Sequence, residues 1–340
     1  MGPASRRPYG ALVALCVVII THLIVSLAIY PEPMPRRDLR RKLAALTGRA
    51  PAQLIVAGDS RAECGILPAT LAGQVGIPAN RAINMGSPAC DLPGVLAGYR
   101  AFANRFDPHP ILIVSVSLVE FNDRAAHRLI GDETLWSLGP LERLRLATPK
   151  RALTSLFLPE RELLSRMLVE PFLLDTHKPM VVSEQGYRGQ RTRRRYPPQL
   201  LEHDVNYLNE SWFNDPQFQG VRWRLFRQSV QALRDAGAQV VLLDSPEHPQ
   251  LVQAMRGTPM ETQDEQFHKQ LAQYCRDNHV PLLRYTAESL CADAACAADP
   301  GSSFVSLVHV NRTGAERLTA RVGEAVSNLI ATGVLHRPGE

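Results

Sequence analysis

The chain has 340 residues, of which 45% are hydrophobic and 21% charged, and its formal net charge is +5. This composition is ordinary for a globular protein, and the length suffices for one large α/β domain with an insertion or for two small domains. The charge is only mildly basic and no nucleic-acid-binding motif accompanies it, so we expect no nucleic-acid partner.

The first elements of the chain predict a membrane anchor. Residues 11–30 are apolar and carry no formal charge apart from that of His22 when it is protonated. Twenty such residues match the hydrocarbon thickness of a bilayer. We therefore expect a single transmembrane helix after a cytoplasmic tail at residues 1–10. A cleavable signal peptide is the alternative, because Ser26-Leu-Ala28 resembles a small-x-small cleavage site.

The charges around this segment leave its orientation open. Two arginines precede it, and five basic residues follow it between positions 36 and 42. The positive-inside rule alone would place the rest of the chain in the cytoplasm. Disulfides, if they form, indicate the opposite side, because they persist in oxidising compartments.

The cysteines allow up to two such disulfides. None of the six belongs to a Cys-x-x-Cys pair, which argues against a structural zinc site. Cys64 and Cys90 each follow a predicted strand end and could meet there. Cys291 and Cys296 bracket a short loop that a disulfide could close. Buried thiols are the alternative for both pairs.

A linker and a regular alternation of elements follow. Pro31-Glu-Pro-Met-Pro35 is incompatible with a helix and begins a linker at residues 31–50. The folded domain then extends over residues 51–335. Its predicted strands are 53–57, 81–85, 110–118, 238–244 and 280–285. Its predicted helices are one from about residue 62, then 68–75, 92–106, 222–236, 262–278 and 313–331. Five short apolar strands alternating with helices predict a three-layer, doubly wound, mostly parallel sheet.

Residues 124–220 break this alternation. Their leucine-rich segments predict a largely helical insertion, of the kind that forms lids or substrate walls. They also contain an arginine-rich run at 188–195. This run is typical of a solvated loop, and its alternative interpretation is a contact with an anionic polymer or a lipid headgroup.

Polar residues and glycines stand where the predicted strands end. The first strand ends at Gly58-Asp59-Ser60, and the N–H groups of the next helix point back at this turn, where they would stabilise an oxyanion. Gly86 follows the second strand, Asn122 follows the third, and His309 precedes the last helix. We expect Ser60, Gly86 and Asn122 to converge, because carboxyl ends of parallel strands share one edge of the sheet, and His309 can approach from the last loop.

These positions resemble the four blocks of the SGNH (GDSL) hydrolase family. That family has Ser in a Gly-Asp-Ser turn, then Gly, then Asn, and finally His in an Asp-x-x-His segment. The resemblance covers about residues 51–330. Gly-Asp-Ser-Arg at 58–61, Asn-x-Gly at 84–86 and His-x-Asn-x-x-Gly at 309–314 are similar to the membrane-anchored branch. That branch includes DltD-like proteins and accessory O-acyltransferases of exopolysaccharide systems such as alginate and cellulose. The resemblance implies an SGNH-like sheet with flavodoxin-like strand order.

The resemblance also implies the roles of the site residues. Ser60 would be the nucleophile and His309 the general base that takes its proton, since a serine hydroxyl is a weak nucleophile without one. The N–H groups of Ser60 and Gly86 and the side chain of Asn122 would form the oxyanion hole. No metal or cofactor is implied, and the sequence has neither a Gly-x-Gly-x-x-Gly motif nor a P-loop.

Two departures from the family pattern bear on the site. Ser306 stands three residues before His309, where the family has Asp. Asp299, ten residues before His309, could orient the imidazole instead, or a backbone carbonyl could do so. In the third block Glu120 takes the place of the family's Gly, which leaves the role of Asn122 less secure.

We therefore expect a single-pass inner-membrane protein whose catalytic domain faces the periplasm. It would act through an acyl-enzyme, as an esterase or O-acyltransferase, on a cell-surface or secreted polysaccharide. A membrane-bound acyltransferase or polymer synthase would be its partner. One alternative is a catalytically degenerate SGNH domain that binds a glycan or a partner protein, which Ser306 favours. The other is a soluble lipase-type esterase, which predicts a cleaved signal and an apolar face on the insertion.

Overall fold

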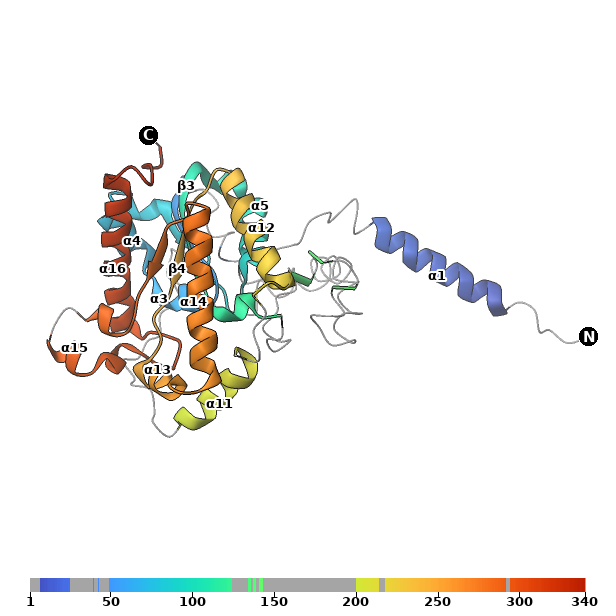
Figure 1. Cartoon of the computed structure of the whole chain (residues 1–340). Helices are drawn as coiled ribbons and strands as arrows, with labels where there is room; N and C mark the ends of the chain where they lie inside the picture. The colour runs from blue at the N-terminus through green and yellow to red at the C-terminus, as the bar shows by residue number, and fades with distance from the viewer. Residues whose placement is uncertain are drawn as a thin grey trace, which may run out of the picture. The chain divides into compact units, whose positions relative to one another are not determined.

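The structure is a computed structural model of the whole chain (Figure 1). It describes residues 7–24, 49–123, 200–213, 218–291 and 294–339, with a few single positions: Leu39, Lys42, Thr134, Leu135, Ser137, Leu138, Leu141 and Glu142. The chain divides into two compact units. The unit Pro35–Thr134 with Val181–Glu340 contains the sheet, and helix α1 belongs to the other unit.

Within the described residues, five parallel strands form one sheet in the order β2-β1-β3-β4-β5. The strands are β1 (Ala52–Ala57), β2 (Ala82–Asn84), β3 (Phe106–Val116), β4 (Gln239–Asp244) and β5 (Leu282–Arg284). The predicted α/β class and parallel sheet are confirmed. From β2 the chain crosses back over β1 to β3, so the winding reverses between β1 and β3. Ligands of doubly wound sheets bind at the carboxyl ends of the strands at such a reversal.

Helices cover both faces of the sheet. One apolar cluster joins Ile55 and Ala57 of β1 to α5 (Leu92–Ala101), α12 (Val221–Asp235) and α14 (Pro259–Asp277). A second cluster joins Leu54 and Val56 to α4 (Pro68–Gln74) and α16 (Arg312–Ala331). Figure 1 shows α4 and α16 on one side of the sheet and α5 and α12 on the other. Burial on both faces explains why the strands are continuous apolar runs, and the expectation of three layers is confirmed.

Shorter elements connect these layers. They are α3 (Ser60–Gly65), α11 (Leu201–Ser211), α13 (Pro249–Met255), α15 (Ala294–Ala298), and the 3₁₀ turns η2 (Ala79–Arg81), η3 (Ala103–Arg105), η4 (Leu118–Phe121), η8 (Glu288–Leu290) and η9 (Pro300–Ser303). Helix α5 ends at Ala101, earlier than the expected residue 106, because η3 and the first residue of β3 occupy that stretch.

The N-terminal helix α1 spans Arg7–Ile24. Of the expected span at 11–30, residues 25–30 lie outside the described residues, as do most of the linker at 31–50, most of the insertion at 124–220 and the arginine-rich run at 188–195. Among the helices that the structure describes, none has the combination of length and apolar character needed to cross a bilayer.

Of the two cysteine pairs considered, one forms a disulfide and the other consists of buried thiols. Cys291 and Cys296 form a disulfide that closes the short loop between them, with a Cα–Cα distance of 5.1 Å. This confirms one of the two pairs that the sequence allowed. Cys64 and Cys90 are instead buried thiols, so the second pair does not form.

Candidate active site

The turn after β1 places Ser60 at the carboxyl edge of the sheet. Gly58 has a φ of +120°, and a Cβ there would lie 2.5 Å from the carbonyl oxygen of Ser115, so only glycine fits. Asp59 then caps α3, because its Oδ1 accepts a hydrogen bond from the Arg61 N–H at 2.9 Å. This cap starts the helix at Ser60, two residues before the expected start at Ala62.

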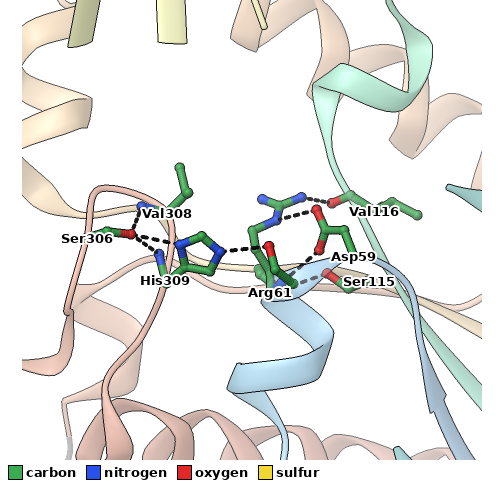
Figure 2. Close-up of polar contacts among 9 residues, drawn as sticks. Asp59, Arg61, Ser115, Val116, Ser306, Val308 and His309 are labelled. Atoms are coloured by element: carbon green, nitrogen blue, oxygen red, sulfur yellow. Dashed lines mark hydrogen bonds and ion pairs between the residues drawn. The ribbon is translucent and has the colours of Figure 1, made fainter. Parts of the chain in front are cut away.

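The predicted nucleophile and base are brought together. His309 Nε2 lies 2.7 Å from Ser60 Oγ, and Figure 2 shows the imidazole of His309 extending from its loop toward the start of α3. The two residues are 249 positions apart in the chain. The geometry is that of a serine hydroxyl hydrogen-bonded to the base that would take its proton.

Ser306 occupies the position of the third catalytic-site residue, the one that would orient the imidazole of His309. Its Oγ lies 2.8 Å from His309 Nδ1 and also accepts the His309 backbone N–H at 3.1 Å (Figure 2). The loop is closed by an antiparallel bridge between Phe304 and Val310 and by a hydrogen bond from the Val305 N–H to the His309 carbonyl. When Nδ1–H donates to Ser306, Nε2 carries the lone pair that can accept the Ser60 proton.

Asp299 lies elsewhere, contrary to the expectation that it orients His309. It precedes η9 and stands beside His248, where burial lowers the pKa of the imidazole and the Asp299 carboxylate opposes that shift. Its backbone carbonyl accepts hydrogen bonds from the N–H and the hydroxyl of Ser302, which hold it in this turn. The side chain that meets His309 Nδ1 is therefore the Ser306 hydroxyl rather than a carboxylate.

Gly86 does not offer its N–H to the site as expected. That N–H donates to Asn84 Oδ1 at 2.8 Å. A Cβ at Gly86 would lie 2.4 Å from the Glu63 backbone nitrogen, so the glycine permits the close approach of α3. The Asn84 amide also donates to the Ala62 carbonyl at 2.8 Å. The Asn-x-Gly pattern thus joins the end of β2 to α3.

Asn122 is likewise committed to a structural contact. Its side chain is fully buried, and Nδ2 donates to the Trp212 carbonyl at 2.8 Å, which joins the end of η4 to the residue after α11. Among the described residues that line the cavity at Ser60, neither Gly86 nor Asn122 is present. Of the three residues expected to supply oxyanion donors, Ser60 is the one that lines the cavity.

Arg61 is one of the two charged residues, with Asp59, that act on the base. This buried guanidinium donates to the Val116 carbonyl, lies 3.4 Å from the Asp59 carboxylate and stacks 5.7 Å from the centre of the Trp212 ring. Burial lowers the pKa of His309, Arg61 lowers it further, and Asp59 acts in the opposite direction. A lowered pKa keeps the imidazole neutral near pH 7, as a general base requires.

A cavity of about 230 Å³ opens at Ser60 and His309. It is lined by Asp59, Ser60, Ala89, Cys90, Asp91, Val119, Glu120, Tyr207, Leu208, Trp212, Arg222, Val308 and His309. The strand-end reasoning missed Tyr207, Trp212 and Arg222, because they come from helices of the insertion and from α12. Glu120 did have a sequence signal, as a departure from the family pattern.

The arrangement can carry out nucleophilic acyl transfer, since it joins an activated hydroxyl, a neutral base and a cavity for the substrate. Among the described residues, no group of three or more His, Cys, Asp or Glu side chains is arranged to hold a metal ion. No protein-family model matches the chain, and no curated protein matches it at a significant level. The geometry of the site is therefore the basis for assigning a function.

Proposed function

We propose that the protein is a serine-dependent acyl-ester enzyme of the SGNH type. Ser60 is the nucleophile, His309 is the general base and Ser306 orients the imidazole. The observation that carries this proposal is the 2.7 Å contact between Ser60 Oγ and His309 Nε2 at the carboxyl edge of β1. Its position at the reversal of the sheet, where doubly wound folds bind their ligands, supports the proposal.

The reaction proceeds in two halves through an acyl-enzyme. Ser60 Oγ attacks the carbonyl carbon of an ester while His309 Nε2 takes the hydroxyl proton, and the Ser60 N–H donates to the oxyanion. His309 then gives that proton to the leaving alcohol as the C–O bond breaks, leaving the acyl group on Ser60. In the second half His309 deprotonates water or a second hydroxyl, which attacks the acyl group, and Ser60 Oγ regains a proton.

The resemblance of the four blocks supports a substrate class. We propose that the substrates are O-acyl groups of a cell-surface or secreted polysaccharide. Hydrolysis or transfer is decided by whether water or a sugar hydroxyl arrives second.

The apolar run at 11–30 supports attachment to the inner membrane beside a membrane-bound acyltransferase or polymer synthase. Alkaline carbonate washing of cell membranes tests the attachment, and release of the full-length chain into the wash would contradict it.

A second candidate is a non-catalytic domain that binds a glycan or a partner protein. One observation favours it: the Gly86 N–H and the Asn122 amide, two of the three expected oxyanion donors, are hydrogen-bonded to Asn84 and Trp212. An oxyanion hole that lacks a donor loses about 10²–10³ in rate. The Ser60–His309 contact favours catalysis over this candidate.

Release of p-nitrophenol from p-nitrophenyl acetate by the full-length chain tests the two against each other. Catalysis predicts that Ser60→Ala and His309→Ala each lower kcat by at least about 10³. His203→Ala, at an exposed position of α11, is the matched control and should behave as the wild type. Absence of turnover from the folded wild type would favour the binding domain, and turnover that survives in both site variants would contradict the assigned nucleophile and base.

A further inference from the structure

Most of the cavity wall at Ser60 is apolar or aromatic, but one part of it carries charged groups. Asp91, Glu120 and Arg222 line this cavity, and they also line a second cavity of only about 10 Å³. They therefore form the part of the wall that lies between the two cavities. Glu120 is 5% exposed and Arg222 2% exposed, so both side chains are withdrawn from bulk water.

Three buried polar atoms of Glu120 and Arg222 have no hydrogen-bond partner among the described residues, although Arg222 Nη1 donates to the Asn122 carbonyl at 3.3 Å. Among the described residues, neither carboxyl oxygen of Glu120 has a hydrogen-bond partner, and neither does Nη2 of Arg222. The Asp91 carboxylate lies 3.8 Å from Arg222 Nη2, which is too long for a hydrogen bond. Buried polar groups without partners destabilise a fold, so their retention beside a cavity indicates a role toward a ligand.

The surrounding charges indicate which ligand fits. The charged groups that act on Glu120 are Asp59 and Asp91, and Arg222 and Arg61, whose formal charges cancel. Burial, followed by the two carboxylates, raises the pKa of Glu120 well above its usual range, which favours the neutral acid. An anionic ligand would bring an uncompensated charge into this buried wall, whereas a neutral hydroxyl group would not.

We propose that Glu120 and Arg222 form a subsite for a hydroxyl group of the alcohol part of the substrate, as in a sugar or another polyol. The hydroxyl oxygen accepts a hydrogen bond from Arg222 Nη2, and the hydroxyl hydrogen is donated to a carboxyl oxygen of Glu120. One hydroxyl thus supplies a partner to both residues. The subsite rests on the proposed acyl-ester function, because it names the part of the substrate that the cavity selects.

The first test compares two esters that differ only in hydroxyl groups. Acetate release from 1-O-acetylglycerol and from n-propyl acetate is measured with the full-length chain, and the ratio of the two kcat/KM values is taken. Glu120→Leu should lower this ratio by at least about tenfold, because the hydroxyl loses its partner. Glu120→Gln, which keeps a donor and an acceptor, should retain most of the preference.

Controls keep this comparison interpretable. Glu120→Leu should fold, because it replaces a buried carboxyl group that has no partner with an apolar side chain. Glu316→Leu is the matched control, since Glu316 lies on α16 and its side chain is 52% exposed. Its ratio should equal that of the wild type. An unchanged ratio in Glu120→Leu would overturn the subsite while leaving the acyl-ester function intact.

A second measurement detects the subsite without any turnover. Saturation-transfer difference NMR with methyl β-D-glucopyranoside is recorded on Ser60→Ala and on Ser60→Ala combined with Glu120→Leu. Transfer to the sugar protons in the first protein and its loss in the second are expected. Equal transfer in both, or transfer in neither, contradicts the subsite. If the full-length chain hydrolyses neither ester but saturation transfer still depends on Glu120, the acyl-ester function would be rejected and the subsite supported.

Discussion

At the third position of the site a hydroxyl group stands where the resembled family has a carboxylate. Ser306 Oγ lies 2.8 Å from His309 Nδ1 and also accepts the backbone N–H of the same residue. A neutral hydroxyl fixes the tautomer of the imidazole but adds little stabilisation to the imidazolium that forms during proton transfer. Orientation of the base is therefore the main contribution of Ser306.

Two replacements of Ser306 distinguish orientation of the His309 imidazole from electrostatic stabilisation of its protonated form. Ser306→Ala should lower kcat for p-nitrophenyl acetate by about tenfold to a hundredfold, because the ring loses its partner. Activity requires neutral His309, whose pKa is lowered by burial, so the acid limb of the wild-type pH–rate profile should have its midpoint below 6.5. Ser306→Asp should restore the rate and move this midpoint upward, because a carboxylate favours the imidazolium.

The pH profile also distinguishes a role of Ser306 toward His309 from a purely structural cause of the lower kcat. If Ser306→Ala only loosened the loop, the melting temperature of the protein would fall. The acid limbs of Ser306→Ala and Ser306→Asp would then have the same midpoint. An acid limb that stays in place in Ser306→Asp would contradict the assigned role of the third residue.

The sequence was sufficient to predict the residues of the site that follow from chain order, and no more. Ser60 was placed at the carboxyl edge of the sheet because its turn ends the first predicted strand. His309 was assigned from its match to the last block of the resembled family, on a loop that can approach this edge. Gly86 and Asn122 were placed near that edge correctly, but their hydrogen-bond partners, Asn84 and Trp212, depend on packing between elements. Strand-end patterns carry no information about such contacts.

At the scale of elements, one ion pair joins α14 to the carboxyl end of β4 and another joins β4 to β5. His268 of α14 contacts Asp244 at 2.9 Å and Asp264 at 3.2 Å, and Arg284 of β5 lies 3.5 Å from Asp244. Burial opposes the charge on His268, but the hydrogen bonds that the ring donates to the two carboxylates, together with their charges, outweigh it and raise the pKa of His268 to about 9. Burial and the same acidic residues raise the pKa of Glu247 to about 8.

Both shifts make the fold less stable at alkaline pH. A histidine whose pKa is raised on folding stabilises the native state fully below pH 6.5, and this stabilisation is lost as the pH rises through about 9. Glu247, whose pKa is raised from 4.5 to about 8 on folding, lowers the stability progressively as the pH rises from 4.5 to about 8. His268→Gln should therefore lower the free energy of unfolding by about 1–3 kcal/mol at pH 6 and by much less at pH 10.

Urea denaturation followed by circular dichroism at the two pH values measures this difference. His203→Gln on α11 is the matched control, because its side chain is exposed and should change stability at neither pH. An equal loss of stability at pH 6 and pH 10 in His268→Gln would show that the histidine acts through packing rather than through charge.

Element boundaries were harder to predict than element types, and prolines explain the largest differences. Strand β3 begins at Phe106 instead of the expected Pro110, because its register against β1 shifts between Ala52 and Leu54 and accommodates two prolines there. Helix α13 was not predicted, and the structure has Pro249 at its first position after a His248 cap, where a proline is well tolerated.

At the scale of the whole molecule, hydrophobic pattern was sufficient to predict the α/β class. Strands buried on both faces must be continuous apolar runs, and the helices between them must present one apolar side, so the alternation of the two has few solutions. The strand order could not follow from pattern alone, because each crossover can run in either direction along the sheet. The Cys291–Cys296 bridge was one of two pairs that spacing allowed.

The central claim is that Ser60 forms a covalent bond to an acyl group with His309 as its base. Intact-mass analysis of the full-length chain after treatment with a fluorophosphonate probe tests this claim most directly. The account predicts one added probe, on the peptide that contains Ser60, and no addition to Ser60→Ala or His309→Ala. A folded wild type without adduct, or an adduct that forms equally in Ser60→Ala, would contradict it.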